Sequence, residues 1–217
     1  MIGKGVYTLA EAARFASIHP QRVRSWFKAR DDSTGLHPVF QSDYKPISDD
    51  YAISFLDLID VLVAGRFRES GVSMHMVRQS RTILAKELDT CHPFCHRNLY
   101  TDGSRVFCFV ADEINDQTLH EVISRQQFFR YIQSYLEHVD YSNTTKIAKR
   151  WRITQGVVLD PAIHLGKPTV EGTGVTTYII NAQYQANNRD ASLVADLYEI
   201  SEKDVQNAVA FETGIAA

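Results

Sequence analysis

The sequence is short of cysteine and has no long hydrophobic run. Three cysteines in 217 residues are too few for the disulfide framework of a small secreted domain. The opening stretch "MIGKGVYTLAEAARF" contains no apolar core of signal-peptide length. No later run approaches the roughly 20 apolar residues that span a bilayer. From these absences we expect a cytoplasmic protein without a membrane partner.

An excess of positive charge is also missing. The chain carries 23 Lys and Arg against 26 Asp and Glu, which gives a formal net charge of -3 at pH 7. The molecule as a whole therefore has no affinity for nucleic acid or for acidic membranes. Any nucleic-acid site must come from a local segregation of charge. With 44% hydrophobic residues, the chain can bury one large core or two small ones.

The segment "YTLAEAARFASIHPQRVRSWFKAR" predicts two short helices joined by a tight turn. Thr8 and Glu11 have the spacing of a capping box, and Pro20 fits the first turn of the second helix. Val23 and Trp26 recur at helical spacing and bury one face. Two short helices with a joint at "SIHP" have the shape of a helix-turn-helix.

Every charged residue between positions 12 and 30 is basic: Arg14, Arg22, Arg24, Lys28 and Arg30. Arg22 and Arg24 lie early on the second helix, the part that meets base edges when such a helix enters a major groove. A solvated helix surface is the alternative interpretation. The run of cations without an acid, in a chain that is acidic overall, favours DNA binding.

The next residues strengthen this interpretation. The region "DDSTGLHPVFQSDYKPISDDYAIS" is polar and turn-rich, as a wing or hairpin would be. Ser54 and Asp57 then mark a helix start, and "FLDLIDVLVAGRFRESGVSMHMVRQSRTIL" predicts two amphipathic helices. This order of elements, over roughly residues 1–88, resembles the winged helix of the mercury-resistance-regulator (MerR) type. In that family the second helix and the wing contact DNA. The resemblance implies DNA contacts at Gln21, Arg22, Arg24, Lys28 and Lys45.

The middle of the chain, residues 89–150, predicts a strand hairpin followed by a connecting helix. "RNLYTDGSRVFCFV" has an Asp-Gly turn between apolar runs, which is a hairpin signal. "LHEVISRQQFFRYIQSYLEHVDYS" then carries aromatic and aliphatic residues at helical spacing. This helix could pack in the core or against a second subunit.

A metal site is considered because Cys91, His92, Cys95, His96 and Cys108 are close in sequence. Tetrahedral zinc sites usually take their four ligands from two short-spaced pairs, and Cys91 with Cys95 is the one clear thiol pair. We therefore assign no metal and no cofactor, and interpret Cys108 as a small hydrophobe in the hairpin. The alternative is a stand-alone MerR-like regulator that senses metal or redox state through Cys91 and Cys95.

The stretch "LDPAIHLGKPTVEGTGV" concentrates residues that shape the backbone. Its glycines and prolines favour three successive turns between short extended pieces, and so predict a compact hairpin that leads into a helix. The phosphate-loop pattern G-x-x-x-x-G-K-[ST] and the dinucleotide fingerprint are both missing. We therefore do not expect phosphate binding here.

Residues 156–212 resemble a small domain of antitoxins from bacterial toxin–antitoxin modules. Its signature is a strand with Asp-Pro, then Gly-Lys-Pro, then Gly-Thr-Arg, then three helices. Gly174 replaces the usual arginine. Together with the N-terminal winged helix, this domain resembles VapB-type antitoxins, whose partner is a PIN-like ribonuclease. The matching residues are Asp160, Pro161, Gly166, Lys167, Pro168, Gly172 and Thr173.

The last expected helix, "SEKDVQNAVAFE", is acidic, and Ser201 with Asp204 marks its start. Phosphates would repel such a helix. We therefore expect the last domain to contact a protein rather than DNA, and its Gly/Pro hairpin to shape the corner that presents the helices.

Taken together, these patterns predict a mainly α protein with small β wings or hairpins. We expect a winged helix-turn-helix in residues 1–88, a hairpin and connecting helix in 89–150, and a three-helix domain in 151–217. The expected function is that of a non-enzymatic antitoxin and autorepressor. It would bind a PIN-like ribonuclease toxin, and operator double-stranded DNA as a homodimer, because one short recognition helix covers too few base pairs.

Overall fold

The computed structural model describes residues 3–28, 38–46, 51–101 and 134–214. The chain divides into two compact units. The N-terminal unit comprises Tyr7–Ala148, and the C-terminal unit comprises Lys149–Ala217 together with Met1–Val6. The first residues join the C-terminal unit through a backbone hydrogen bond, in which the Val6 N–H donates to the Leu165 carbonyl at 2.8 Å.

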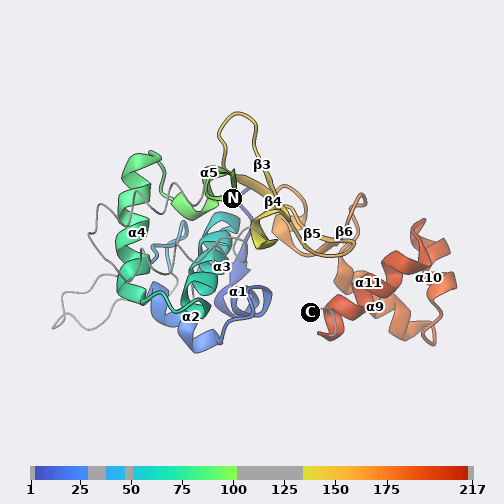
Figure 1. Cartoon of the computed structure of the whole chain (residues 1–217). Helices are drawn as coiled ribbons and strands as arrows, with labels where there is room; N and C mark the ends of the chain where they lie inside the picture. The colour runs from blue at the N-terminus through green and yellow to red at the C-terminus, as the bar shows by residue number, and fades with distance from the viewer. Residues whose placement is uncertain (1–2, 29–37, 47–50, 102–133, 215–217) are drawn as a thin grey trace. The chain divides into compact units, whose positions relative to one another are not determined.

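The N-terminal unit begins with two short helices, α1 (Leu9–Phe15) and α2 (Pro20–Phe27) (Figure 1). A capping box starts α1: the Glu11 N–H donates to the Thr8 hydroxyl at 3.1 Å, and the Thr8 N–H donates to the Glu11 carboxylate at 2.8 Å. Pro20 opens α2, where a missing N–H costs nothing. Val23 and Trp26 are buried, so both helices follow the predicted pattern.

The joint between α1 and α2 is a left-handed turn. Ser17 has a φ of 55°, and the Ile18 N–H donates to the Ala13 carbonyl at 2.8 Å, the bond of a Schellman motif. The turn directs Ile18 onto α3 (Phe55–Glu69), where a Cβ added at Gly65 would lie 2.3 Å from Ile18 Cδ1. Gly65 is therefore needed for this close approach of the joint to α3.

Two longer helices, α3 and α4 (Met74–Glu87), follow. A capping box between Ser54 and Asp57 starts α3, as the sequence predicts. The strand β2 (Ala52–Ile53) precedes α3 and pairs antiparallel with β1 (Tyr7–Thr8), which precedes α1. This two-stranded sheet holds the starts of α1 and α3 together. Residues 29–37 and 47–50 lie outside the described residues, so the wing stays a prediction.

After α4 come a short 3-10 helix, η2 (Pro93–Cys95), the one-turn helix α5 (Asn98–Thr101) and the strand β3 (Val139–Tyr141). The strand predicted at the start of "RNLYTDGSRVFCFV" is wrong, because Asn98–Thr101 is helical. His96 starts this turn: its Nδ1 accepts from the Asn98 N–H and its carbonyl accepts from the Leu99 N–H. The Asp-Gly turn, Cys108 and most of the connecting helix lie outside the described residues.

The C-terminal unit contains three antiparallel strands, β4 (Ala148–Thr154), β5 (Val157–Leu159) and β6 (Thr169–Val170). Trp151 lies opposite Leu159, and Val157 lies opposite Val170. The 3-10 helix η3 (His164–Gly166) lies between β5 and β6 in sequence.

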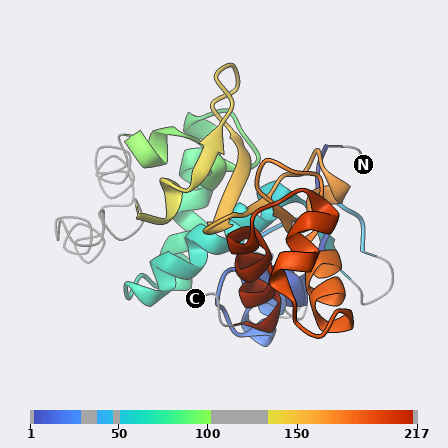
Figure 2. The same cartoon turned by 90° about the vertical axis from the view of Figure 1, so that its right-hand side faces the viewer.

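Three helices follow the strands: α9 (Thr177–Ala186), α10 (Ala191–Tyr198) and α11 (Glu202–Thr213). They form one bundle, coloured orange to red in Figures 1 and 2. Its core contains the fully buried side chains of Val170, Ile180, Val194, Val205 and Ala208. The predictions of a mainly α protein with small β elements, and of three helices at the C-terminal end, are confirmed.

Candidate functional site

The predicted DNA-contacting residues all lie on the surface. Gln21, Arg22 and Arg24 belong to α2, Lys28 ends it, and Lys45 lies in the segment 38–46; all five are exposed. The opposite face of α2 is buried through Val23, Trp26 and Phe27, and this fixes which side of the helix faces solvent. Exposure leaves these side chains able to reach a DNA duplex, and contact with DNA stays a prediction.

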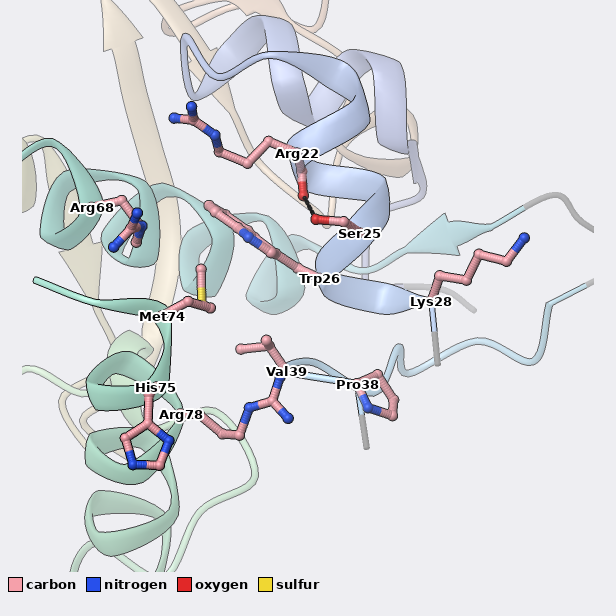
Figure 3. Close-up of a pocket in the computed structure, with 10 residues that line it drawn as sticks. All are labelled: Arg22, Ser25, Trp26, Lys28, Pro38, Val39, Arg68, Met74, His75 and Arg78. Carbon is pink, nitrogen blue, oxygen red and sulfur yellow. Dashed lines mark hydrogen bonds between the residues drawn. The ribbon is translucent and has the colours of Figure 1, made fainter. Parts of the chain in front are cut away.

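A pocket of about 310 Å³ adjoins α2 (Figure 3). Its walls come from α2, from the segment at Pro38 and Val39, from the last turn of α3 and from the start of α4. The residues that line it are Arg22, Ser25, Trp26, Lys28, Pro38, Val39, Arg68, Met74, His75 and Arg78. Three arginines, a lysine and a histidine therefore surround one hollow, and among the described residues that line it none is acidic.

The fold places further cations, Arg68, His75 and Arg78, next to the basic surface of α2. The sequence patterns did not predict this position for them. Arg68 is held in place because its guanidinium donates to the Val72 carbonyl across the turn between α3 and α4. His75 and Arg78 lie in the first turns of α4. A pocket with this many cations in its described lining is a favourable place for a phosphate group. We call Arg22, Lys28, Arg68, His75 and Arg78 the cationic pocket.

One arginine of the same stretch has a structural role. Arg66 is buried, forms an ion pair with Glu69 at 2.7 Å and donates to the Ala16 carbonyl at 3.1 Å. Its guanidinium also lies 4.0 Å from the centroid of the Tyr135 ring. Arg66 therefore stabilises the end of α1 against α3 and is not available to DNA.

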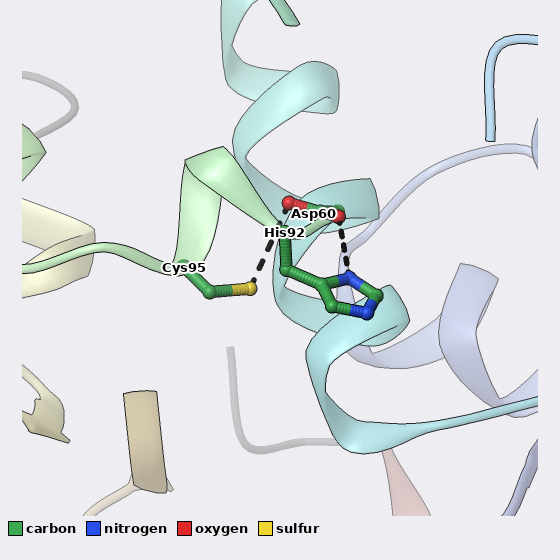
Figure 4. Close-up of side chains that lie close together, drawn as sticks. All are labelled: Asp60, His92 and Cys95. Carbon is green, nitrogen blue, oxygen red and sulfur yellow. Dashed lines mark hydrogen bonds and ion pairs between the residues drawn. The ribbon is translucent and has the colours of Figure 1, made fainter. Parts of the chain in front are cut away.

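A second group of polar side chains is buried inside the N-terminal unit (Figure 4). It joins Asp60 of α3 to His92 and Cys95, which precede and end η2. His92 Nδ1 lies 2.9 Å from Asp60 Oδ2, and the Cys95 thiol lies 3.7 Å from Asp60 Oδ1. Donor atoms of the three residues all lie within 4.8 Å of one another. We call Asp60, His92 and Cys95 the buried triad.

Two further carboxylates adjoin the buried triad. His92 Nε2 lies 3.3 Å from Asp43 Oδ1, and His92 Nδ1 lies 3.9 Å from Asp57 Oδ1. On the other side, the Arg81 guanidinium lies 4.0 Å from Asp60 Oδ2. Three carboxylates therefore face two basic side chains in a mostly buried volume.

This environment changes the acidity of the groups in it. Burial alone lowers the pKa of His92, but the hydrogen bond and charge of Asp60, with the charges of Asp57 and Asp43, outweigh burial and raise that pKa from 6.5 to about 9. Burial raises the pKa of Asp57 against the opposing effect of two backbone N–H donors. Burial, with the charges of Asp60 and Asp57, raises the pKa of the Cys95 thiol well above its usual value.

The cysteines are not arranged as the sequence suggested. Cys95 is fully buried, whereas Cys91 is exposed and does not belong to the buried triad. His96 also faces elsewhere, since its Nδ1 accepts from the Asn98 N–H. Asp60 is the member that sequence analysis missed, because it lies on α3, 32 residues before His92, which precedes η2. Its only signal is a second acid inside the apolar run "FLDLIDVLV".

In the C-terminal unit, the motif residues mainly shape the backbone. Asp160 Oδ1 accepts from the Ala162 N–H at 2.9 Å, and the Thr173 hydroxyl donates to the Val170 carbonyl at 3.0 Å. The Pro168 carbonyl accepts from the Thr177 N–H at 3.0 Å, and so anchors the start of α9.

The motif glycines and Lys167 complete this description. Gly166 and Gly172 have φ values of 84° and 78°, which favour glycine. Gly174, in contrast, lacks a positive φ, and a Cβ there would meet no atom within 4 Å. The backbone at position 174 therefore accepts a residue with a Cβ atom. Lys167 is exposed, so its side chain is not needed for the turn itself.

Exposed apolar side chains gather in the C-terminal unit. Among the described residues, the large hydrophobic side chains that are strongly exposed all lie between positions 165 and 197: Leu165, Tyr178, Ile179, Leu193 and Leu197. Leu193 and Leu197 are 43% and 58% exposed and lie four residues apart, on one face of α10. Exposed apolar residues that cluster in this way are typical of a protein interface.

Acidic residues accompany these apolar side chains. Asp196 and Glu199 are exposed on and after α10, and Glu202 is exposed at the start of α11. In the described part of the chain, no helix is both long and apolar enough to cross a membrane.

Three comparisons with known proteins bear on these features. A family described as "Protein of unknown function (DUF433)" matches residues 157–211, which run from β5 into α11. A protein of Mycobacterium tuberculosis described as "Putative antitoxin VapB45" is 24% identical over 223 residues, covering 94% of this chain and 92% of that protein.

The fold comparison covers the chain to the same extent. A crystal structure titled as that of Rv2018 from Mycobacterium tuberculosis superposes with a TM-score of 0.75 at 23% sequence identity, over 94% of this chain and 96% of that one. This likeness shows that the fold is one already observed in a crystal. The chain is thus similar, along nearly its whole length, to a protein with an antitoxin name, and its C-terminal unit carries the DUF433 sequence pattern.

Proposed function

We infer that this chain is the cytoplasmic antitoxin of a type II toxin–antitoxin pair. It neutralises a PIN-like ribonuclease toxin and represses its own operon by binding operator DNA as a dimer. The observation that carries this proposal is the full-length similarity to a protein named as an antitoxin. Catalysis is not part of the proposal.

The DNA-binding half rests on the basic surface of α2. Arg22 and Arg24 are exposed near the start of this helix, as base-contacting residues of a recognition helix must be. Because the cationic pocket adjoins α2, we expect it to hold a backbone phosphate when α2 enters the major groove. Phosphate contacts fix the orientation of such a helix and supply most of its affinity, whereas base contacts supply specificity.

The toxin-binding half rests on the C-terminal unit. Its exposed apolar residues include Leu193 and Leu197 of α10, and the exposed acids Asp196, Glu199 and Glu202 of the same stretch would repel DNA. An apolar patch with a polar rim is the usual composition of a protein interface. A ribonuclease needs a cationic surface for its RNA substrate, so an acidic rim suits such a partner.

Two measurements on the full chain test the two halves. For the first, a duplex from the region upstream of its own reading frame should bind with an affinity that falls steeply with salt, and a scrambled duplex should bind more weakly. For the second, the product of the adjacent gene should co-purify with this chain and lose its ribonuclease activity in the complex. Failure of the second measurement with success of the first would leave a DNA-binding regulator without a toxin.

A further inference from the structure

The buried triad has the donor set of a transition-metal site. Its three side chains offer one carboxylate oxygen, one imidazole nitrogen and one sulfur, which are the ligand types that zinc takes in proteins. The thiolate disfavours magnesium and calcium, which prefer oxygen ligands. The three donors come from two elements, because Asp60 belongs to α3 and the other two flank η2.

The distances are compatible with one tetrahedral ion. Zinc bonds of about 2.0 Å to nitrogen or oxygen and 2.3 Å to sulfur place neighbouring donors roughly 3.3–3.6 Å apart. In the structure, His92 Nδ1 lies 2.9 Å from Asp60 Oδ2, Cys95 Sγ lies 3.7 Å from the other carboxylate oxygen, Asp60 Oδ1, and one donor atom of each residue lies within 4.8 Å of the other two. Side-chain shifts of about 1 Å would bring these donors to the spacing of one tetrahedral ion.

The other ring nitrogen of His92 supplies a second, independent observation. Metal-binding histidines usually donate their remaining ring N–H to a carboxylate or carbonyl, which fixes the ring and raises its basicity. His92 Nε2 faces Asp43 Oδ1 at 3.3 Å, while Nδ1 faces Asp60 Oδ2 at 2.9 Å. The ring is therefore held in the orientation that a ligand would need.

Charge and a fourth donor complete the site. Asp57 Oδ2 accepts from the backbone N–H groups of Asp43 and Ser54, and its Oδ1 lies 3.9 Å from His92 Nδ1. Asp57 is not among the residues whose donor atoms lie within 4.8 Å of one another, so a water molecule would fill the fourth position. The carboxylates outnumber Arg81 and His92 in the same volume, so a divalent cation would be attracted there.

We propose that Asp60, His92 and Cys95 bind one zinc ion, which joins α3 to the η2 segment and so stabilises the N-terminal unit. Binding releases the Cys95 thiol proton and any proton shared between His92 and Asp60, because the ligands must be deprotonated. Asp43 acts as a positioning residue through His92 and does not touch the ion. The site is separate from the cationic pocket and from the C-terminal unit, and does not depend on the proposed antitoxin function.

Elemental analysis and cobalt spectroscopy of the full chain, purified without a histidine tag, test this site. We expect one zinc per chain. After removal of zinc with a chelator, one equivalent of Co²⁺ should give the visible bands of a tetrahedral ion and a near-ultraviolet thiolate-to-cobalt charge-transfer band. Chelation should also lower the Tm, because the metal binds the folded state.

Three variants test the thiolate ligand and the carboxylate that orients His92. Cys95→Ser should lose the charge-transfer band, whereas Cys91→Ser, the matched control, should keep both the band and the zinc. Asp43→Asn should weaken zinc affinity by about 10–100-fold and keep the band, as expected for a residue that orients a ligand. Circular dichroism reports whether each variant is folded.

The wild-type chain alone can overturn the proposal. A folded wild-type protein that contains no zinc and shows no charge-transfer band with Co²⁺ lacks this site. Bound metal without that band places the ion on surface groups instead, which also contradicts the proposal. A band that disappears in Cys91→Ser and persists in Cys95→Ser would assign the thiolate to the wrong cysteine.

Discussion

The first and last helix pairs of this chain are built alike and expose opposite charge. α1 and α11 each begin with a capping box, and α2 and α11 each bury one apolar face. The exposed charged residues of α2 are basic, whereas those on and between α10 and α11 are acidic apart from Lys203. Similar local geometry therefore presents two differently charged surfaces, and under the proposed function this charge decides which partner each pair attracts.

The interiors of the two units differ as well. Among the described residues, the buried charged groups Asp57, Asp60, Arg66 and His92 all lie in the N-terminal unit. The buried polar groups of the C-terminal unit are the threonines Thr169, Thr176 and Thr177. Changes in pH should therefore affect the stability of the N-terminal unit first.

The largest expected effect comes from reversing charge on α2. The double variant Arg22→Glu, Arg24→Glu should lower affinity for the upstream duplex by about a hundredfold or more, since it replaces two phosphate or base contacts with repulsion. Repression of a reporter fused to the upstream region should be lost, while toxin binding persists. Lys203→Glu on α11, a charge reversal in the other unit, should leave repression unchanged. Equal loss in both variants would remove the distinction between the units.

A comparable change in the C-terminal unit should weaken toxin binding and leave DNA binding unchanged. Leu193→Asp with Leu197→Asp should weaken toxin binding by about tenfold to a hundredfold, because it places two charges in the centre of an apolar interface. Isothermal titration with the purified toxin measures this. Ser192→Asp is the matched control: it adds a charge to the exposed first turn of α10, where the helix dipole favours an acid. Unchanged toxin binding in the double variant would place the interface elsewhere.

The buried charges of the N-terminal unit predict how the stability of the metal-free protein changes with pH. Because the folded state raises the pKa of His92 from 6.5 to about 9, its contribution to stability is complete below pH 6.5 and is lost as pH rises through 9. The loss is on the order of 3 kcal/mol. Urea unfolding at several pH values in the presence of a chelator should show this decline, and His92→Gln should flatten it. A stability that rises over the same range contradicts the account.

The smallest effects concern two neighbouring glycines of the C-terminal unit. Gly172→Ala should cost about 1 kcal/mol, because alanine is strained at a φ of +78°. Gly174→Ala should be neutral or slightly stabilising, because no atom lies within 4 Å and the backbone suits an L-residue. Thermal unfolding of the two variants measures the difference. A Gly174→Arg variant as stable as wild type would show that the usual arginine fits this turn.

The sequence predicted elements whose causes are local. The helix starts at Thr8, Ser54 and Ser201 depend on residues three positions apart, and each forms the expected capping box. The turns of the Gly/Pro stretch were predictable for the same reason, since glycine and proline act on their own backbone angles. The exposure of Arg22 and Arg24 follows from the helical spacing of Val23 and Trp26.

Features that depend on distant contacts were not predicted. Asp60 meets His92 only because α3 packs beside η2, and no short pattern records this contact. Arg68 and Arg78 reach the pocket beside α2 through the turn between α3 and α4. The residues around Leu99 favour a strand by their local pattern. In the structure they form a helical turn instead, which His96 starts by accepting from the Asn98 N–H.

The salt dependence of DNA binding tests the central claim of a division of charge most directly. Fluorescence anisotropy of the labelled upstream duplex gives the Kd at several salt concentrations. The account predicts that the Kd rises steeply with salt, and that Arg22→Ala with Arg24→Ala reduces the log–log slope by about 2. Binding that is absent at low salt, or a slope that is the same with and without the two arginines, would contradict it.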